Sequence, residues 1–402
     1  ETKSGSETLG AIFGSSGGNP RGSLLARPID FQTDEVMVAL GYSDTASHYS
    51  LSYTAIRFRN DDASLAFSNP FNNPAWDPRS NFNAGAAGLI SLEPDNQSHQ
   101  FALSGTRGLG SQTRLSGSLI ASRLTQDDSF LPFSSVINTS APLPAMDLDG
   151  EVDSLTGRLN LATRLNQSTT MRLHYQYRDR NNNTHTYNFQ RVPGDAAQQQ
   201  PLVSSNTRVN RLYDFRREGI GVDLTYRFGP RTRLSGDYEF EVTDRSAADV
   251  ATTRERRGSL KLDLNPTSNS KGWLKIARSE REASTYDSTV PFIAGHNPDY
   301  IATLVGNELF ENDPLLRRYH LTDRDRDELS ANLHLFVTES IGINWLARAA
   351  DNDYPETRVG IRESKARHFT LDVSYSPGTD WSASFFYSYD TFENRNLGFA
   401  RR

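Results

Sequence analysis

Apolar and polar residues alternate one by one along much of this chain. Between positions 220 and 228, for example, Ile220, Val222 and Leu224 alternate with Gly221 and Asp223. Successive side chains of a β-strand point to opposite faces, so each such segment has one apolar and one polar face. The pattern predicts about fourteen strands, many of roughly 9–11 residues, near residues 36–42, 49–55, 101–103, 115–121, 155–161, 171–177, 220–228, 234–242, 260–264, 274–276, 329–335, 341–347, 369–375 and 381–389.

Short and long connections alternate between the predicted strands. The short ones lie near residues 43–48, 106–112, 166–169, 229–232, 265–272, 337–341 and 376–380. The long ones lie near residues 58–99, 124–153, 179–218, 243–257, 279–328 and 349–367. Tight turns on one rim and long loops on the other are typical of an antiparallel, up-and-down transmembrane β-barrel. We therefore predict an all-β barrel with its long loops on one side, the extracellular side.

The predicted barrel forms a single domain over residues 1–402, in which residues 1–33 are a loop or an incomplete N-terminal part. Aromatic residues support the membrane assignment, because Tyr226 and Phe228 precede one short connection and Tyr375 and Trp381 flank another. Amphipathic rings at the edges of an apolar band are typical of membrane interfaces. The alternative is a large soluble all-β protein, whose strands are usually about five or six residues long.

Composition excludes several other classes of protein. The 402 residues are 36% hydrophobic and 10% aromatic, which is too aromatic for a disordered chain. No segment approaches the roughly 20 apolar residues of a membrane-spanning helix. Cysteine is absent, so the sequence offers no disulfide, no thiolate ligand and no covalent haem attachment. The net charge of −6 argues against a nucleic-acid-binding role.

Motifs for catalysis or metal binding are weak. The acidic run at 323–328 has the oxygen ligands that calcium prefers, but arginines alternate with it, which favours an ion-pair network. His174, His334 and His368 fall on the predicted polar faces, and no second ligand lies at a recognised metal-binding spacing. We therefore expect no catalytic residue, no metal site and no cofactor on this chain.

The polar positions of the predicted strands are rich in arginine and carboxylates. In a barrel whose outside faces lipid, these positions line the lumen. Arginine suits fixed, bidentate contacts with carboxylates. The same charges would also line an aqueous pore, so sequence alone leaves both interpretations open. The candidate lumen-facing contact residues are Arg158, Arg164, Arg172, His174, Arg178, Asp223, Arg227, Asp237, Glu239, His334, Arg348, His368 and Asp372.

Three stretches of the chain resemble one protein family. Residues 92–101 contain PDNQSHQ, residues 312–326 have the sequence NDPLLRRYHLTDRDR, and residues 362–365 (RESK) precede a predicted strand. They resemble the PDNxxHQ segment, the NPLLRxYxLxDRDR loop and the approach to the final hairpin in decahaem-associated outer-membrane proteins of the MtrB/PioB type. The similarity extends from about residue 30 to the end of the chain.

This resemblance implies a very wide β-barrel in the bacterial outer membrane. It also implies that a periplasmic multihaem cytochrome inserts into the lumen, that an extracellular multihaem cytochrome docks outside in some members, and that the haems carry electrons across the membrane. Members of the family are longer and have a C-x-x-C pair that this sequence lacks, so we expect a fragment of a larger barrel. The alternative functions are a diffusion porin and a soluble β-rich surface protein.

Overall fold

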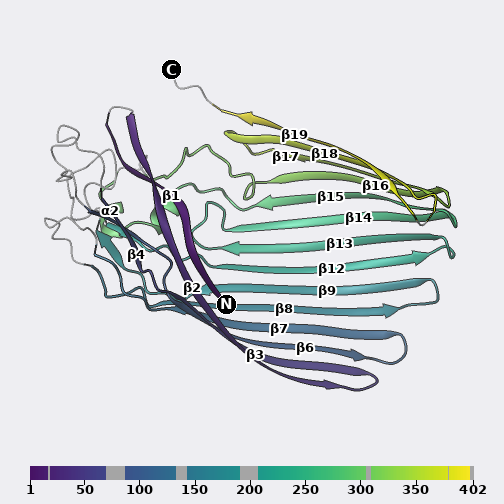
Figure 1. The fold of residues 1–402 in the computed structure, drawn as a ribbon, viewed down its shortest axis with the longest axis horizontal. Coiled ribbons are helices and arrows are strands. Elements are labelled where there is room, and N and C mark those ends of the chain that lie inside the picture. Colours follow the sequence, from purple (N-terminus) through teal and green to yellow (C-terminus); the bar gives the residue numbers. More distant parts are fainter. Residues whose placement is uncertain are drawn as a thin grey trace.

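The structure, a computed structural model, consists almost entirely of β-strands (Figure 1). It describes residues 1–16, 19–68, 87–132, 143–190, 207–304, 309–378 and 380–398. Fifteen strands form one sheet, and every neighbouring pair in it is antiparallel. In sheet order they are β1 (Thr2–Ser16), β2 (Asn19–Ser43), β3 (Ser47–Asn60), β6 (Asn96–Gly108), β7 (Thr113–Gln126), β8 (Gly150–Arg164), β9 (Thr169–Asn182), β12 (Phe215–Arg227), β13 (Thr232–Arg245), β14 (Thr252–Thr267), β15 (Ser270–Ala283), β16 (Arg324–Thr338), β17 (Ile341–Asp353), β18 (Gly360–Tyr375) and β19 (Ala383–Leu397).

The strands follow one another in the sheet as they do in the sequence, which confirms the predicted up-and-down order. Fourteen of them coincide with the predicted segments, and β1 is additional. β1 pairs with residues 19–32 of β2, whereas residues 31–43 of β2 pair with β3. These residues thus form two strands, where the sequence analysis expected a loop or an incomplete N-terminal part at residues 1–33. The β1–β2 ladder is rich in Ser, Thr and Gly, so it is held by backbone hydrogen bonds and has no clear alternation for sequence analysis to detect.

The connections lie on two opposite rims of the sheet (Figure 1). One rim has the short turns at 44–46, 109–112, 165–168, 228–231, 268–269, 339–340 and 376–382. The other, the loop rim, holds the hairpins β4–β5 (Ser64–Ser68 and Ala87–Ser91) and β10–β11 (Asn188–Gln190 and Thr207–Val209), and the short helices α1 (Val290–Ala294) and α2 (Pro298–Ile301). Neither described helix is long and apolar enough to span a membrane.

Two connections on the loop rim are much shorter than predicted. Residues 246–251 join β13 to β14, and residues 354–359 join β17 to β18. The prediction of long loops at 243–257 and 349–367 was therefore wrong. These strands continue past their apolar segments because polar and charged residues extend the ladders, as in the pairing of Glu241 with Glu255.

The two faces of the sheet differ in chemistry. The predicted apolar positions are exposed, with 69% of Leu40, 59% of Ile220 and 52% of Leu260 accessible. The buried hydrophobic residues in the described ranges are few: Ile29, Val250, Leu321 and Tyr354. A soluble protein would cover so much apolar surface with a core, whereas a large exposed apolar face marks contact with a membrane or a partner. The apolar face is therefore the lipid-facing outside of a transmembrane sheet.

Aromatic pairs mark the turn-side edge of the apolar face. The rings of Tyr226 and Phe228 have centroids 4.7 Å apart, and those of Tyr375 and Trp381 are 5.3 Å apart. Phe228 and Trp381 are more than half exposed. Rings of this kind at the end of an apolar band match the interfacial belt of a membrane barrel.

Candidate functional site on the polar face of the sheet

Cross-strand register places the thirteen predicted contact residues on one face, opposite the apolar face. Arg172 lies opposite Asp223, Asp223 lies opposite Asp237, and Arg348 lies opposite His368. Directly opposed residues of adjacent strands share a face. The other members in this register are Arg158, Arg164, His174, Arg178, Arg227, Glu239, His334 and Asp372.

Asp223 on β12 contacts two residues of the neighbouring strand β9 on the polar face. Its carboxylate accepts a hydrogen bond from Arg172 Nε at 2.8 Å and lies 3.3 Å from His174 Nδ1. The His174 ring lies over Gly221, where any Cβ would collide with it. Arg172 is largely exposed, so its ion pair contributes at most about 1 kcal/mol to stability. The main effect of this ion pair is therefore to fix the positions of the Arg172 and Asp223 side chains on the polar face.

A second group of contacts lies on the C-terminal strands. His368 Nδ1 on β18 lies 2.5 Å from Asp390 Oδ1 on β19, and Asn344 donates to Asp372 at 3.4 Å. Arg348 sits directly opposite His368. The polar face of the C-terminal strands thus has the same mixture of arginine, histidine and carboxylate groups as that of the central strands.

Carboxylates and arginines on this face differ in how they are paired. Every predicted carboxylate has a polar partner: Asp223 has Arg172, Asp237 has Ser259, Glu239 has Gln176 and Asp372 has Asn344. Among the described residues, no ion pair includes the following predicted arginines: Arg158, Arg164, Arg178, Arg227 and Arg348. The polar face therefore presents unpaired positive charge, although the chain as a whole has a net charge of −6.

Further charged residues on this face escaped the sequence analysis. Arg217 pairs with Glu241 at 2.6 Å, and Arg324 pairs with Glu255 at 2.6 Å. Arg245 lies at the end of β13. The predicted strands end where their apolar residues end, so most of these positions fall in predicted loops. Extending the two-residue period by two or three steps would have found them.

Among the described residues of the polar face, small side chains separate larger ones and leave three open hollows. One of about 520 Å³ near the short turns is bordered by Arg114, Arg164 and Arg172. A second of about 460 Å³ lies at the loop ends of β12 to β15. A third of about 650 Å³ is lined in part by Trp273 and Phe392. Shallow hollows along a broad wall suit contacts with a large surface better than capture of one small substrate.

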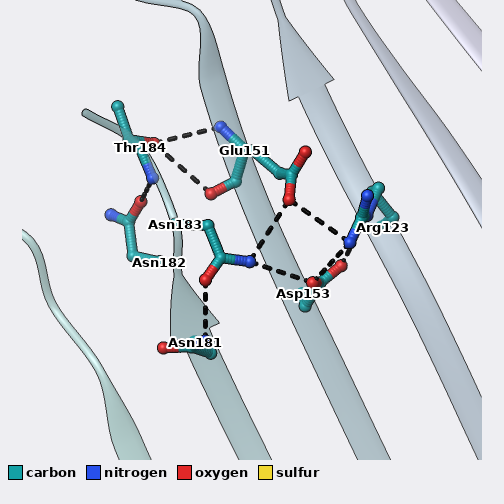
Figure 2. A network of polar contacts seen from close by, with 7 residues as sticks. All are labelled: Arg123, Glu151, Asp153, Asn181, Asn182, Asn183 and Thr184. Carbon is teal, nitrogen blue, oxygen red and sulfur yellow. Dashed lines mark hydrogen bonds and ion pairs between the residues drawn. The ribbon is translucent and has the colours of Figure 1, made fainter.

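The apolar outer face ends at the loop rim in a polar collar formed by Arg123, Glu151, Asp153 and Asn183. Figure 2 shows the contacts between these residues. Arg123 on β7 forms two parallel hydrogen bonds with Asp153 on β8, each of 2.8 Å. Asn183 donates to Asp153 at 2.9 Å and to Glu151 at 3.3 Å. Arg123 and Asp153 are register partners two residues beyond Ala121 and Leu155 on the same outer face. The collar therefore marks where the lipid-facing band ends.

The loop rim contains an ordered loop cluster, formed by residues 246–251, 284–304, 309–323 and 354–359. Val250 and Thr322 are fully buried in it. Arg281 on β15 anchors the cluster by donating to the carbonyl oxygens of Tyr319 at 2.6 Å and Thr322 at 2.9 Å. Much of the motif at 312–326 that carried the family resemblance lies in this cluster, so its described contacts are structural.

His296 links two long loops within this region. It forms a backbone bridge with Arg208, so residues 207–214 and 284–304 lie on the same side of the sheet. They belong to the long connections predicted near 179–218 and 279–328. His296 Nδ1 lies 2.7 Å from the Phe292 carbonyl oxygen, and its ring stacks on Phe292 at 3.9 Å. Burial lowers the pKa of His296 and raises the pKa of the Tyr286 hydroxyl. Both groups are therefore held neutral as packing elements.

The acidic run at 323–328 is divided between the two faces of β16. Asp327 lies in the outer register and pairs with Arg278 at 3.3 Å, whereas Glu328 lies on the polar face and pairs with Arg326. Within the described ranges, no group of three or more histidine and acidic side chains is arranged to hold a metal ion. Two acidic residues of the run, Asp327 and Glu328, thus form ion pairs with arginines, as the alternating pattern favoured.

Comparison with known sequences agrees with this arrangement. A family model described as "Putative outer membrane beta-barrel porin, MtrB/PioB" matches residues 1–401. "Outer membrane protein MtrB" of Shewanella baltica (strain OS185) is 28% identical over 375 residues, covering 93% of this chain and 49% of the relative. The chain thus spans about half the length of the curated relative it matches.

Comparison with solved structures supports the barrel fold. The copper transporter OprC aligns with a TM-score of 0.54 and 10% identity, covering 93% of this chain and 55% of that one. The FrpB iron transporter from Neisseria meningitidis (F3-3 variant) aligns with a TM-score of 0.52 and 11% identity, covering 92% and 54%. These identities inform on fold alone. The family matched is one of porin-like outer-membrane barrels rather than of enzymes. The chain belongs to the MtrB/PioB family of outer-membrane β-barrel proteins.

Proposed function

We propose that the polar face lines the lumen of a wide barrel and sheathes a multihaem c-type cytochrome inserted from the periplasm. The complex would be an electron conduit across the outer membrane for extracellular electron transfer. Family membership and the similarity to MtrB support this function. The haems would belong to the cytochrome, and this chain would contribute no cofactor of its own. A second multihaem cytochrome would dock from outside, at the loop rim.

The observation that carries this proposal is the charge of the polar face. Its four predicted contact carboxylates have polar partners. Among the described residues, Arg158, Arg164, Arg227 and Arg348 have no ion-pair partner. A protein inside a barrel needs a wall that supplies hydrogen bonds and ion pairs. Unpaired arginines supply them to acidic side chains and to haem propionates.

The apolar face explains why such a cytochrome would need a sheath. The polar surface of a folded cytochrome cannot be placed in hydrocarbon, because its backbone and side-chain groups would lose their hydrogen bonds to water. The exposed leucines and aromatic residues of the outer face are suited to lipid instead. The barrel would therefore place a polar wall between the lipid and the electron carrier.

A diffusion porin is the second candidate function. The family description contains the word porin, and the open hollows on the polar face would also suit a water-filled channel. The two functions differ in what occupies the lumen, so one paired assay separates them.

The test measures electron flux and solute leakage in liposomes that contain the full-length protein, with and without the cytochrome. An internal electron acceptor and an internal small solute are followed together. We expect no electron flux without the cytochrome, and electron flux with little leakage when it is inserted. Leakage that the cytochrome leaves unchanged, with no electron flux in either sample, would refute the sheath and support the porin.

A further inference from the structure

Four arginines converge at the loop end of the polar face, around the hollow of about 460 Å³. Arg178 on β9 lies directly opposite Arg217 on β12. Arg245 on β13 and Arg281 on β15 border the same hollow. Like charges placed directly opposite each other on adjacent strands are destabilising. This arrangement therefore calls for a compensating negative charge.

The contacts of these arginines leave most of that charge uncompensated. Arg245 donates to the Thr253 hydroxyl at 3.0 Å and to the Thr243 carbonyl oxygen at 3.4 Å. Arg281 donates to backbone carbonyl groups of the loop cluster. Arg178 lies over the Phe215 ring at 5.2 Å. None of the three has a carboxylate partner among the described residues.

The carboxylates that line the hollow are already engaged. Glu241 pairs with Arg217 at 2.6 Å, and Glu255 pairs with Arg324 at 2.6 Å. Asp214 accepts a hydrogen bond from the backbone N–H of Asn182 at 2.7 Å. The acidic groups of this chain therefore do not neutralise the unpaired arginines around the hollow.

We infer that this hollow binds carboxylate groups on the surface of the protein that occupies the lumen. The inference rests on the proposed function. Arg178 and Arg245 supply the free N–H donors, because guanidinium groups bind carboxylates through two parallel hydrogen bonds. The buried Thr243 and Thr253 form part of the lining and leave room between the longer side chains. Haem propionates and acidic side chains present the same chemical group.

The position of the hollow gives this contact a role. Arg281 borders the hollow and also anchors the loop cluster through Tyr319 and Thr322. A carboxylate bound here would lie beside that anchor, at the end of the lumen opposite the short turns. The hollow would therefore fix how far the occupant inserts as well as attract it.

The first experiment compares binding of the cytochrome to three forms of the full-length barrel. The variant Arg178→Gln with Arg245→Gln removes two charges at the hollow. The matched control, Arg216→Gln with Arg254→Gln, removes two charges from neighbouring strands at a similar height but in the outer register. We expect binding to weaken by about tenfold or more in the hollow variant, with a weaker dependence on salt, and to stay close to wild type in the control. Heat-modified gel mobility verifies that each barrel is folded.

The second experiment needs no variant. Phenylglyoxal modifies accessible arginines, and mass spectrometry reports the extent of modification at Arg178 and Arg245. We expect the cytochrome to protect both residues. Hexaglutamate and free iron protoporphyrin IX, tested separately, distinguish acidic side chains from propionates as the source of protection.

The outcomes separate this inference from the proposed function. If the wild-type barrel does not bind the cytochrome at all, the proposed function fails, and this inference fails with it. If the wild-type barrel binds it but the hollow variant behaves like the control, the proposed function stands and the carboxylate site is refuted. Modification of Arg178 and Arg245 that the cytochrome leaves unchanged would also refute the site.

Discussion

Replacing Leu173 with arginine tests which face of the sheet meets lipid. Leu173 lies on β9 between Leu161 of β8 and Val222 of β12, and 40% of it is exposed. Met171 and Tyr175 flank it in the same outer register. Leu173→Arg would therefore place a charged group within the apolar band, in contact with hydrocarbon.

The free-energy cost of Leu173→Arg depends on how deep this position lies in the membrane. An arginine on the lipid face of a barrel costs about 2–4 kcal/mol near the membrane midplane and about 0–1 kcal/mol near the interfaces. Leu173 has apolar neighbours on every side within its face, so the upper range applies. Because about 1.4 kcal/mol changes an equilibrium tenfold, the folding equilibrium should shift by roughly 30- to 700-fold. Urea titration of the full-length protein in lipid vesicles, followed by tryptophan fluorescence and gel mobility, measures this shift.

His174→Arg is the matched control, one residue away on the opposite face. The new guanidinium group would lie beside Asp223, which is 3.3 Å from His174 Nδ1 and already faces Arg172. We expect the free energy of unfolding to fall by less than about 1 kcal/mol, because the polar face is exposed to water and offers a carboxylate partner. Equal losses for the two variants, or a larger one for His174→Arg, would refute the assignment of the faces.

Three further predictions concern the two rims. In intact cells, a cysteine-specific reagent that cannot cross the membrane should label Asp299→Cys on the loop rim and not Gln167→Cys in a short turn, and the reverse result would invert the predicted orientation. The folded-state pKa of His296 lies below its ordinary value of 6.5, so protons favour the opened loop cluster as the pH falls below about 6.5. Hydrogen exchange at 290–301, relative to intrinsic rates, should therefore be faster at pH 5 than at pH 7.5, and His296→Gln should reduce that difference. Gly360 has a φ of +116°, and a Cβ there would lie 2.8 Å from the Arg317 carbonyl oxygen. Gly360→Ala should loosen the loop cluster by about 1–3 kcal/mol, measured by proteolysis at 309–323, whereas Gly229→Ala in an open turn should have little effect.

The fold was largely predictable because its main signal is local. Lipid on one side and water on the other impose a two-residue period on every strand, and that period is visible without knowing which strands are neighbours. The signal fails where lipid does not reach. β1 has a ladder rich in Ser, Thr and Gly, and the loop ends of β13 and β14 have charged residues in both registers.

The candidate site was less predictable because it depends on register between strands. The two-residue period alone assigns Arg178 to the polar face. Only the alignment of β9 with β12 places it opposite Arg217. The loop cluster depends on contacts across still longer stretches of sequence, such as the ion pair of Arg211 with Glu311. No short-range pattern encodes such a pairing.

The net charge of −6 would by itself suggest a basic partner, since oppositely charged surfaces attract. The structure distributes that charge unevenly. Asp325, Asp327, Asp351 and Asp353 lie opposite one another in pairs on the outer register near the loop rim. On the polar face, by contrast, Arg158, Arg164, Arg178, Arg227 and Arg348 have no carboxylate partner among the described residues. Attraction over the short distances inside a lumen depends on the nearby wall, because salt screens charges more than about 8–10 Å away. An occupant of this lumen would therefore meet a basic surface, and an acidic cytochrome surface would be its complement despite the acidity of the chain.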